Sequence, residues 1–258
     1  NDIEYNPVFS SYLFVSQNES YLFVNEKSIT DEVSLHLKSA KLIVQPYQQI
    51  EAFLTKLKPY SNILADKDGL NYNLSKKIPK ECKIISELNP VSKLKAVKNS
   101  IEIENYHQAQ IRDGIAMCKY LKWLEENVNN GNLTENSAAQ KLEQFRSQQI
   151  NFKGLSFYSI SAYKENAALP HYSANETNAA LLKAQGMYLI DSGGQYLDGT
   201  TDITRTIALG EVADEQKVDF TLVLKGHIRL ACAKFPEGTK GFHLDTLARL
   251  DLWKHNKD

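Results

Sequence analysis

The sequence predicts a small α/β domain followed by an α+β domain whose antiparallel sheet is covered on one side. Residues 1–90 alternate short apolar runs with amphipathic stretches, residues 100–147 have the pattern of two helices, and residues 155–209 are rich in β-branched and aromatic residues. Asn89-Pro90 marks the boundary, because proline pushes the preceding residue out of the helical region. We therefore expect one domain at residues 1–90 and a second at residues 91–258.

The first domain is expected to begin with a β-hairpin, because the apolar runs Tyr12–Ser16 and Tyr21–Asn25 flank a polar turn. Thr30 is the expected N-cap of a helix with acidic residues in its first turn. Further strands are predicted at 41–45, 62–65 and 82–86, with helices at 48–57 and between the last two strands. The domain has neither a glycine-rich phosphate loop nor a cluster of titratable residues, which favours a structural or substrate-limiting role.

The second domain is expected to begin with a long helix at residues 100–128. Apolar residues recur along it at three- and four-residue steps and predict a buried stripe of Ile111, Ile115, Cys118, Leu121 and Leu124. Thr134 opens a second helix, with Ala138, Leu142 and Phe145 facing inward. Strands are predicted at 155–160, 188–191 and 203–209, followed by a helix at 215–233. This order of elements predicts the α+β class for this domain.

Charge and cysteine content exclude several classes of function. The chain has 30 basic and 31 acidic residues without a basic arm or an acidic tail, so neither nucleic acid nor a membrane surface is an expected partner. Its three cysteines, Cys82, Cys118 and Cys232, are widely spaced and predict free thiols rather than a disulfide framework. No apolar run approaches the roughly 20 residues that span a bilayer. A cytoplasmic location is therefore expected.

Two carboxylates form the candidate site. Asp191 ends an apolar strand before Gly193-Gly194, and Asp202 begins the next strand, so the two side chains can lie side by side on antiparallel neighbours. Adjacent carboxylates repel each other unless a proton or a cation lies between them, and a pair of divalent ions can activate a bridging water. Aspartate beside glycine is also common in turns. The spacing alone therefore leaves a metal site and a turn both open.

The wider sequence around these residues resembles a known family. The string Leu189-Ile-Asp-Ser-Gly-Gly-Gln-Tyr-Leu-Asp-Gly-Thr-Thr-Asp-Ile-Thr-Arg-Thr206 resembles the metal-site hairpin of Xaa-Pro aminopeptidases of the cytosolic three-domain type. Five further blocks resemble that family in the same order: Asn6-Pro-Val-Phe-Ser-Ser-Tyr12, Lys95-Ala-Val-Lys-Asn-Ser100, Gly154-Leu-Ser-Phe157, Val223-Leu-Lys-Gly-His227 and Phe235-Pro-Glu-Gly-Thr-Lys-Gly241. Together they cover essentially the whole chain.

The resemblance implies an α/β creatinase-like domain followed by an incomplete α+β pita-bread domain, and removal of an N-terminal residue when proline follows it. Carried over to this sequence, Asp191 would bind one of two divalent ions and Asp202 would bridge both. The expected metal is Mn²⁺, with Co²⁺ or Zn²⁺ as alternatives. His171, which alone would read as a polar loop residue, matches the catalytic histidine that contacts the substrate near the scissile carbonyl.

The chain also departs from the family. The histidine and the two glutamates that complete the dinuclear site have no counterpart here, and we expect them beyond Asp258. Our hypothesis is that the chain is a fragment of a protein that acts on peptides with a penultimate proline. The full-length protein could form a homodimer. The fragment alone is expected to be inactive and poorly folded. Two alternatives remain: a non-catalytic peptide- or protein-binding member of the fold, and a prolidase.

Overall fold

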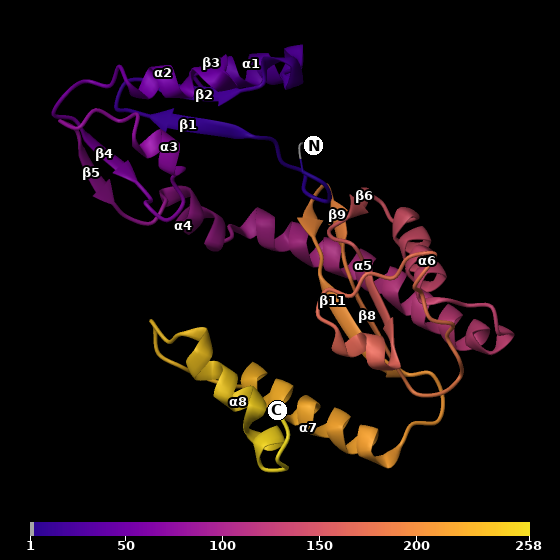
Figure 1. Cartoon of the computed structure of the whole chain (residues 1–258). Coiled ribbons are helices and arrows are strands. Elements are labelled where there is room, and N and C mark those ends of the chain that lie inside the picture. Colours follow the sequence, from indigo (N-terminus) through magenta and orange to yellow (C-terminus); the bar gives the residue numbers. More distant parts are fainter. Residues whose placement is uncertain (1–2) are drawn as a thin grey trace. The chain divides into compact units, whose positions relative to one another are not determined.

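The computed structural model describes residues 3–258, which divide into two compact units (Figure 1). The first unit extends to His107 and the second runs from Gln108 to Asp258, so the division falls within helix α5 (Ser100–Asn127). Asn89 caps α4 (Pro90–Ala96) by accepting a hydrogen bond from the Val91 amide at 3.0 Å. The domain boundary that the sequence suggests at this point stays a prediction.

The first unit contains a three-stranded sheet and a separate two-stranded sheet. In the larger sheet, β1 (Ser11–Val15) and β2 (Ser20–Val24) form an antiparallel hairpin, and β3 (Leu42–Pro46) pairs in parallel with β2. β4 (Asn62–Ala65) and β5 (Lys83–Ser86) form the parallel pair. The predicted hairpin and the other three predicted strands are confirmed, with only small shifts at their ends.

The helices of this unit are short. α1 (Asp31–Ser39) is capped as predicted, because Thr30 Oγ1 accepts a hydrogen bond from the Val33 amide at 3.3 Å. The helix predicted at 48–57 is divided into a 3₁₀ turn and a shorter α-helix, because the backbone tightens to three-residue hydrogen bonds on both sides. The 3₁₀ turn is η2 (Tyr47–Gln49) and the α-helix is α2 (Ile50–Leu54). Two further short segments of this unit are η1 (Glu26–Ser28) and α3 (Tyr72–Ser75).

An aromatic cluster joins α2 to the larger sheet. The ring of Phe53 lies 5.0 Å from that of Phe14, 4.8 Å from that of Tyr21 and 5.2 Å from that of Phe23. Such aromatic pairs add to the stabilisation from buried area. The remaining core of this unit is apolar and comprises Ile50, Leu54, Leu74 and Ile78.

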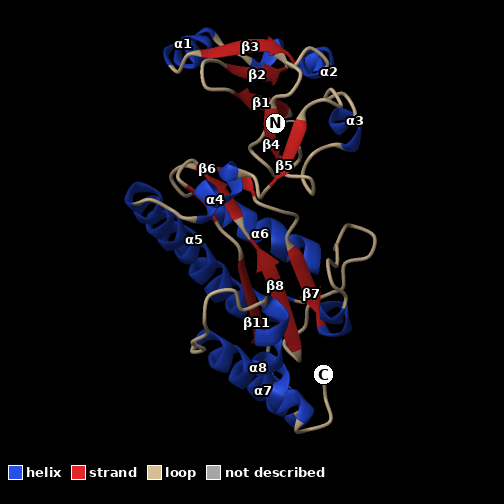
Figure 2. Ribbon diagram, turned by 90° about the vertical axis from the view of Figure 1, so that its left-hand side faces the viewer, coloured by secondary structure: helices blue, strands red, loops and turns tan. Residues whose placement is uncertain are grey.

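The second unit contains two antiparallel sheets of three strands each, in the orders β11-β8-β7 and β10-β9-β6. Figure 2 shows β7, β8 and β11 beside helices α5 and α6. The strands are β6 (Phe152–Leu155), β7 (Ile160–Tyr163), β8 (Met187–Ser192), β9 (Gly194–Tyr196), β10 (Gly199–Thr200) and β11 (Ile203–Ala208). The predicted strands at 188–191 and 203–209 are confirmed as β8 and β11.

The strand predicted at 155–160 is wrong, because the chain changes sheets there. β6 pairs with β9 and β7 pairs with β8, so residues 156–159 cross from one sheet to the other. At the crossing, the Ser156 amide donates to the Gly193 carbonyl at 3.1 Å, and Ser156 Oγ donates to the Thr201 carbonyl at 2.9 Å. These bonds to the turn of the candidate site replace the pairing that a continuous strand would make.

Helices α5 and α6 (Glu135–Ser147) supply the core on which the sheet β11-β8-β7 packs. A 3₁₀ turn, η3 (Val128–Asn130), follows α5, and Thr134 caps α6 through its Oγ1, which accepts from the Ser137 amide at 3.1 Å. Ala138 and Leu142 are fully buried and Phe145 packs against the same core, as predicted. The buried face of β8 presents Tyr188 and Ile190 to these helices.

The buried stripe predicted for α5 is only partly right. Ile111 is 56% exposed, Ile115 is 44% exposed and Cys118 is exposed, whereas Leu121 is partly buried and Leu124 is buried as expected. Other residues of α5 face the core, namely Ala109, Asp113, Ala116, Met117 and Tyr120. A search for apolar periodicity overlooks Asp113, because aspartate is charged. Its ion pair with Arg146 of α6 nevertheless helps to decide which face of α5 is buried.

Helices α7 (Asp214–Ala231) and α8 (Gly241–Trp253) pack on each other. Gly226 allows their close approach, since a Cβ atom there would lie 2.0 Å from the Ala248 carbonyl oxygen. Arg229 and Asp251 form an ion pair of 2.7 Å across the same contact. The helix predicted at 215–233 is confirmed, and Cys232, which follows the last residue of α7, is exposed. Within residues 3–258, no helix combines the length and apolarity needed to cross a membrane.

Candidate metal centre

Asp191 and Asp202 lie on one face of the sheet β11-β8-β7. Asp191 is the penultimate residue of β8 and pairs with Thr204 of β11. Asp202 precedes the first residue of β11, and alternate residues of a strand share a face, so Asp202 and Thr204 point to the same side. The two carboxylates are therefore diagonal neighbours. Pairing across two strands brings them together, as the sequence predicts.

The electrostatics of the two aspartates favour a positive charge between them. Burial, and then the negative charge of Asp191 and a hydrogen bond with it, raise the pKa of Asp202 above its ordinary value. Asp191 Oδ1 is buried without a hydrogen-bond partner. An unpartnered buried carboxylate oxygen is costly unless a proton or a cation compensates it. These oxygens therefore fit the donor chemistry that hard divalent cations require.

Glycine and threonine fix the turn that joins the two aspartates. A Cβ atom at Gly193 would lie 2.0 Å from the Thr201 carbonyl oxygen and 2.2 Å from Ser156 Oγ, so only glycine fits there. Thr201 is buried, and its Oγ1 accepts a hydrogen bond from the Gly194 amide at 2.9 Å. The Thr201 amide donates to the Gly194 carbonyl at 2.9 Å. Asp202 therefore follows directly from an anchored residue.

An ion-pair network holds the tip of this hairpin to α5. Arg112 donates to both carboxylate oxygens of Asp198 at 2.5 and 2.6 Å. Burial alone would raise the pKa of Asp198, but the hydrogen bond and charge of Arg112, together with hydrogen bonds from the backbone and from Asn151, outweigh it and lower that pKa. Beside this pair, Asp113 accepts from Arg146 Nε at 2.7 Å and from the Tyr196 hydroxyl at 2.9 Å. Sequence patterns did not reveal these residues, because a buried ion pair has no periodic signature.

A chain of buried hydroxyl groups anchors β8 from its other face. Ser161 Oγ donates to the Glu135 carbonyl at 2.6 Å and lies 2.6 Å from the Tyr188 hydroxyl, which lies 2.8 Å from the Tyr120 hydroxyl. The single proton of Ser161 is used on Glu135, so Tyr188 must donate to Ser161 and Tyr120 to Tyr188. Burial raises the pKa of Tyr188 to about 12, which keeps these donors protonated. Four elements are thus joined beneath the carboxylate-bearing strand.

His171 lies in the segment that follows β7 and the 3₁₀ turn η4 (Lys164–Ala168). It is exposed and has a φ of +57°, a left-handed conformation that is uncommon for a residue with a side chain. Among the interactions of residues 3–258, none joins His171 to Asp191 or Asp202. The structure therefore brings the two aspartates together but does not bring His171 into contact with them.

The residues described add no third ligand to the aspartate pair. Across residues 3–258, no group of three or more histidine, cysteine, aspartate and glutamate side chains is placed to hold a metal ion. His36 and His107 are exposed on helices. Arg205 donates to the neighbouring Thr204 carbonyl at 2.7 Å, and the ion pairs found among these residues do not include it.

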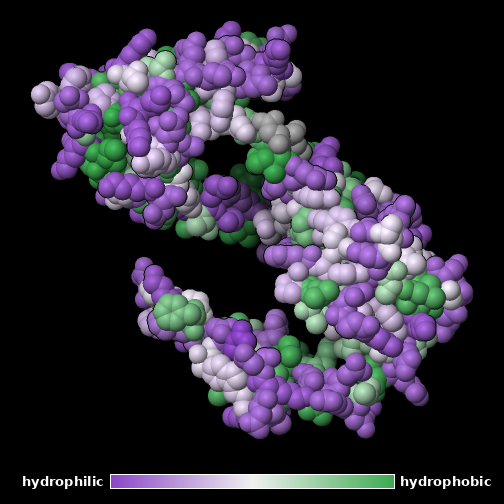
Figure 3. Space-filling model, viewed as in Figure 1, coloured by the Kyte–Doolittle hydropathy of each residue, from purple (hydrophilic) through white to green (hydrophobic). Residues whose placement is uncertain are grey.

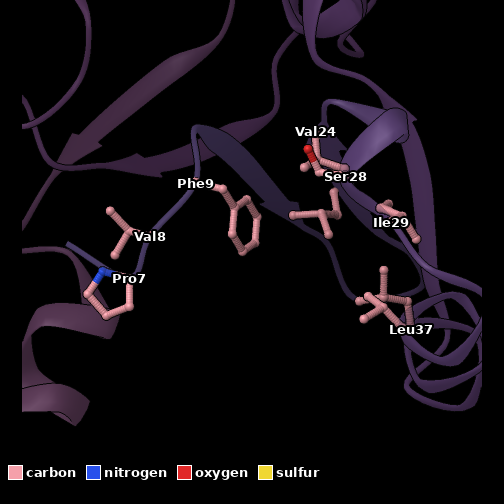
Figure 4. Close-up of a pocket in the computed structure, with 9 residues that line it drawn as sticks. Pro7, Val8, Phe9, Val24, Ser28, Ile29 and Leu37 are labelled. Atoms are coloured by element: carbon pink, nitrogen blue, oxygen red, sulfur yellow. The ribbon is translucent and has the colours of Figure 1, made fainter. Parts of the chain in front are cut away.

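The first unit has a hollow of about 290 Å³ without evident chemistry (Figure 4). Most of its lining is apolar, and Figure 4 shows the ring of Phe9 beside it. The lining residues are Pro7, Val8, Phe9, Leu22, Val24, Ser28, Ile29, Val33 and Leu37, none of which is titratable. The candidate metal site at Asp191 and Asp202 therefore lies in the second unit, and this hollow adds no titratable residue to it.

The chain matches two protein families. Residues 1–102 match the creatinase/prolidase N-terminal domain, and residues 104–257 match metallopeptidase family M24. The whole chain is 42% identical to a probable Xaa-Pro aminopeptidase P of Tuber melanosporum and 40% identical to an uncharacterized peptidase of Schizosaccharomyces pombe, and it covers 44% and 42% of their lengths. The chain thus spans less than half the length of these relatives.

Solved structures agree with these matches. A Caenorhabditis elegans X-prolyl aminopeptidase, described as a cytosolic enzyme with a di-nuclear active site, superposes with a TM-score of 0.91 at 35% identity over 98% of this chain and 42% of that one. A Bacillus anthracis Xaa-Pro dipeptidase shares the fold, with a TM-score of 0.73 at 23% identity, over 97% of this chain and 68% of that one. The creatinase-like domain followed by an incomplete pita-bread domain is therefore confirmed.

Proposed function

Because this chain belongs to metallopeptidase family M24, we propose that it carries the first half of the active site of an Xaa-Pro aminopeptidase. Such an enzyme releases the N-terminal residue of peptides that have proline in the second position. One observation carries the proposal, namely the pairing of Asp191 and Asp202 on one sheet face with Asp191 Oδ1 buried and unpartnered. Relatives named Xaa-Pro aminopeptidase P along the whole chain support the same specificity.

Each site residue has a distinct role in this proposal. Asp191 would supply a ligand to one of two divalent ions and Asp202 would supply a ligand to both, with Mn²⁺ as the proposed metal and Co²⁺ or Zn²⁺ as alternatives. Bound there, the ions would activate water and polarise the carbonyl before proline. His171 contacts the same carbonyl oxygen and stabilises the negative charge that develops on it. The diagonal placement of the aspartates supports the bridging role, because two hard oxygen donors face one space.

The remaining ligands and the general base are proposed to lie outside this chain. Two carboxylates are too few to hold two divalent ions tightly, so the 258-residue chain alone should be inactive. We place the full-length protein in the cytoplasm, with peptides as its substrates. A metal-loaded 258-residue chain that cleaves an Arg-Pro-Pro peptide would contradict this division of the site.

Asp191→Asn in the full-length protein tests the metal centre. The substitution removes a charged oxygen ligand, so we expect Mn²⁺ affinity and kcat on an Arg-Pro-Pro peptide to fall by at least about 100-fold. Titration calorimetry measures the affinity and a peptide-cleavage assay measures the rate. Asp68→Asn, at an exposed aspartate of the first unit, is the matched control and should change neither quantity. Unchanged Mn²⁺ affinity in Asp191→Asn would rule out the assigned ligand.

Substrate length separates the aminopeptidase from a prolidase. A prolidase accepts only dipeptides, whereas the proposed enzyme should cleave longer Xaa-Pro-Xaa peptides at least as fast as Xaa-Pro dipeptides. Comparison of kcat/KM for the two lengths distinguishes them. A full-length protein that binds such peptides without cleaving either would instead be a non-catalytic member of the fold.

A further inference from the structure

Glu135 is a fully buried carboxylate with no cationic partner among the described residues. Burial of a charge is costly unless hydrogen bonds compensate it. Here every neighbour of the carboxylate is a donor. Oε1 accepts from the Tyr163 amide at 2.6 Å and from Asn166 Nδ2 at 3.0 Å, and Oε2 accepts from the Tyr172 hydroxyl at 2.9 Å and the Ala180 amide at 2.8 Å. Its place in the first turn of α6 adds the favourable end of the helix dipole.

These four bonds all reach one segment, residues 163–180. Tyr163 begins the segment and Ala180 ends it, while Asn166 and Tyr172 lie between. The backbone of Glu135 reinforces the attachment, because its amide donates to the Ala180 carbonyl at 3.0 Å and its carbonyl accepts from Ser161 Oγ at 2.6 Å. A single side chain on α6 therefore closes the loop that carries His171.

His171 depends on this attachment because its own backbone is strained. A left-handed φ for a residue with a side chain persists only where surrounding contacts determine it. The next residue, Tyr172, is held at both ends, since its amide donates to the Leu169 carbonyl at 3.2 Å and its hydroxyl donates to Glu135. Asn166 Nδ2 also donates to the Tyr172 hydroxyl at 3.1 Å. The backbone that follows His171 is thus held by a contact that ends at Glu135.

We propose that Glu135 is the positioning residue for His171, acting through the Tyr172 hydroxyl and the two ends of segment 163–180. The carboxylate touches no substrate in this scheme. It restricts the segment to one conformation, so that the imidazole is already in place when charge develops on the substrate. The role given to His171 in this inference rests on the proposed function. The attachment of segment 163–180 to Glu135 does not depend on that function.

Glu135→Gln tests the attachment directly. The variant keeps the size of the side chain but places an amide group against donors, so residues 164–180 should exchange their amide hydrogens at least about 10-fold faster, with exchange in the first unit unchanged. Hydrogen exchange with mass spectrometry on the full-length protein measures this. Glu143→Gln, at an exposed position of the same helix, is the matched control and should leave exchange unchanged. Unchanged exchange in a folded Glu135→Gln protein overturns the proposal.

Kinetics separate positioning from simple stabilisation. Misplacement of His171 should lower kcat about 10- to 100-fold with KM within about twofold, because the imidazole acts in the transition state. Combined with His171→Ala, Glu135→Gln should then cost less than about twofold more. Equal, independent losses from the two substitutions overturn the proposal.

If the Glu135→Gln protein does not fold, Tyr172→Phe provides a second test of the attachment between Glu135 and the segment 163–180. This variant removes one hydroxyl group and should reproduce the faster exchange of residues 169–173 and the fall in kcat, while an unchanged kcat would overturn the proposal. If the wild-type protein cleaves no Xaa-Pro peptide, the proposed function fails, and the exchange experiment still decides whether Glu135 holds the segment.

Discussion

Most buried charged side chains among the described residues are compensated by groups of opposite charge or by hydrogen bonds. Asp113 and Arg146 are both buried and pair through two hydrogen bonds, at 2.7 and 3.0 Å. Asp198 and Arg112 form the partly buried counterpart at the hairpin tip. Asp191 differs from these carboxylates, because its Oδ1 is buried with neither a hydrogen bond nor an ion pair among the described residues. Asp191 is therefore available to bind a ligand, whereas Asp113 and Asp198 stabilise the fold.

The ion pair of Asp198 predicts a pH-dependent contribution to stability. Its pKa is lower in the folded chain than its ordinary value of 3.8, so the pair stabilises the fold above that value and the contribution is lost as the pH falls through the folded pKa. Asp198→Asn should therefore cost about 1 kcal/mol at neutral pH, and the difference should disappear in acid. Urea unfolding across pH measures it. A difference that persists at acid pH would exclude the ion pair as its source.

At the scale of single residues, sequence patterns indicate the candidate metal ligands but not the residues that hold them in place. Asp191 and Asp202 stand out because they belong to a distinctive string, and the structure brings them together. Glu135 was not recognised, since a glutamate in the first turn of a helix is ordinary and gives no indication that four donors will converge on it. Contacts between residues far apart in the sequence give Glu135 its importance, and no local pattern encodes them.

The elements that define the site are limited by how closely backbones approach. At Gly193, where β8 gives way to β9, the chain passes against Thr201 and Ser156 with no room for a Cβ atom. The same approach moves Ser156 out of any strand. The small residues Gly193 and Ser156 therefore allow the chain to pass from the sheet β11-β8-β7 to the sheet β10-β9-β6.

Two alanine substitutions should have opposite signs for this reason. Gly193→Ala places a methyl group into the Thr201 backbone and should destabilise the chain by about 3 kcal/mol or more. Gly114→Ala in α5 meets no atom within 4 Å and should stabilise it by about 0.5–1 kcal/mol. Denaturant unfolding of both variants provides the comparison. Equal effects would show that the contact at Gly193 can relax.

Most elements could be predicted from the sequence, but the buried face of α5 could not. Two apolar sides of α5 compete, one with Ile111 and Ile115 and the other with Met117 and Tyr120. Aliphatic content favours the first side. The structure buries the second, because Asp113 and Tyr120 find partners on α6 and β8. Polar partners across elements decided between them, which periodicity cannot anticipate.

The chain as a whole leaves a substantial apolar surface on α7. Phe220, Leu224 and Ile228 recur at four-residue steps and are 44%, 45% and 52% exposed. Gly226 contacts α8 on a different side of the helix, so this stripe is outside that contact. Hydrophobic residues are visible over α7 in Figure 3. An apolar stripe of this kind on a helix is typical of a face that another surface covers.

Self-association of the 258-residue chain is the expected consequence. Sedimentation velocity should show concentration-dependent species larger than a monomer. Leu224→Glu should shift them toward monomer, because it places a charge within the stripe. Lys225→Glu, at the adjacent exposed position, is the control and should leave the distribution unchanged. A monodisperse monomer of the unmodified chain would exclude the stripe as an adhesive surface.

The local hairpin of Asp191 and Asp202 also bears on the order of events during folding. Asp191 and Asp202 lie only eleven residues apart in the sequence, so their pairing has low contact order. A hydrogen bond to Thr201 and the close backbone approach at Gly193 hold that turn together. We therefore expect the two carboxylates to come together without help from a metal ion, so that under the proposed function metal loading would be a late step rather than the trigger of folding.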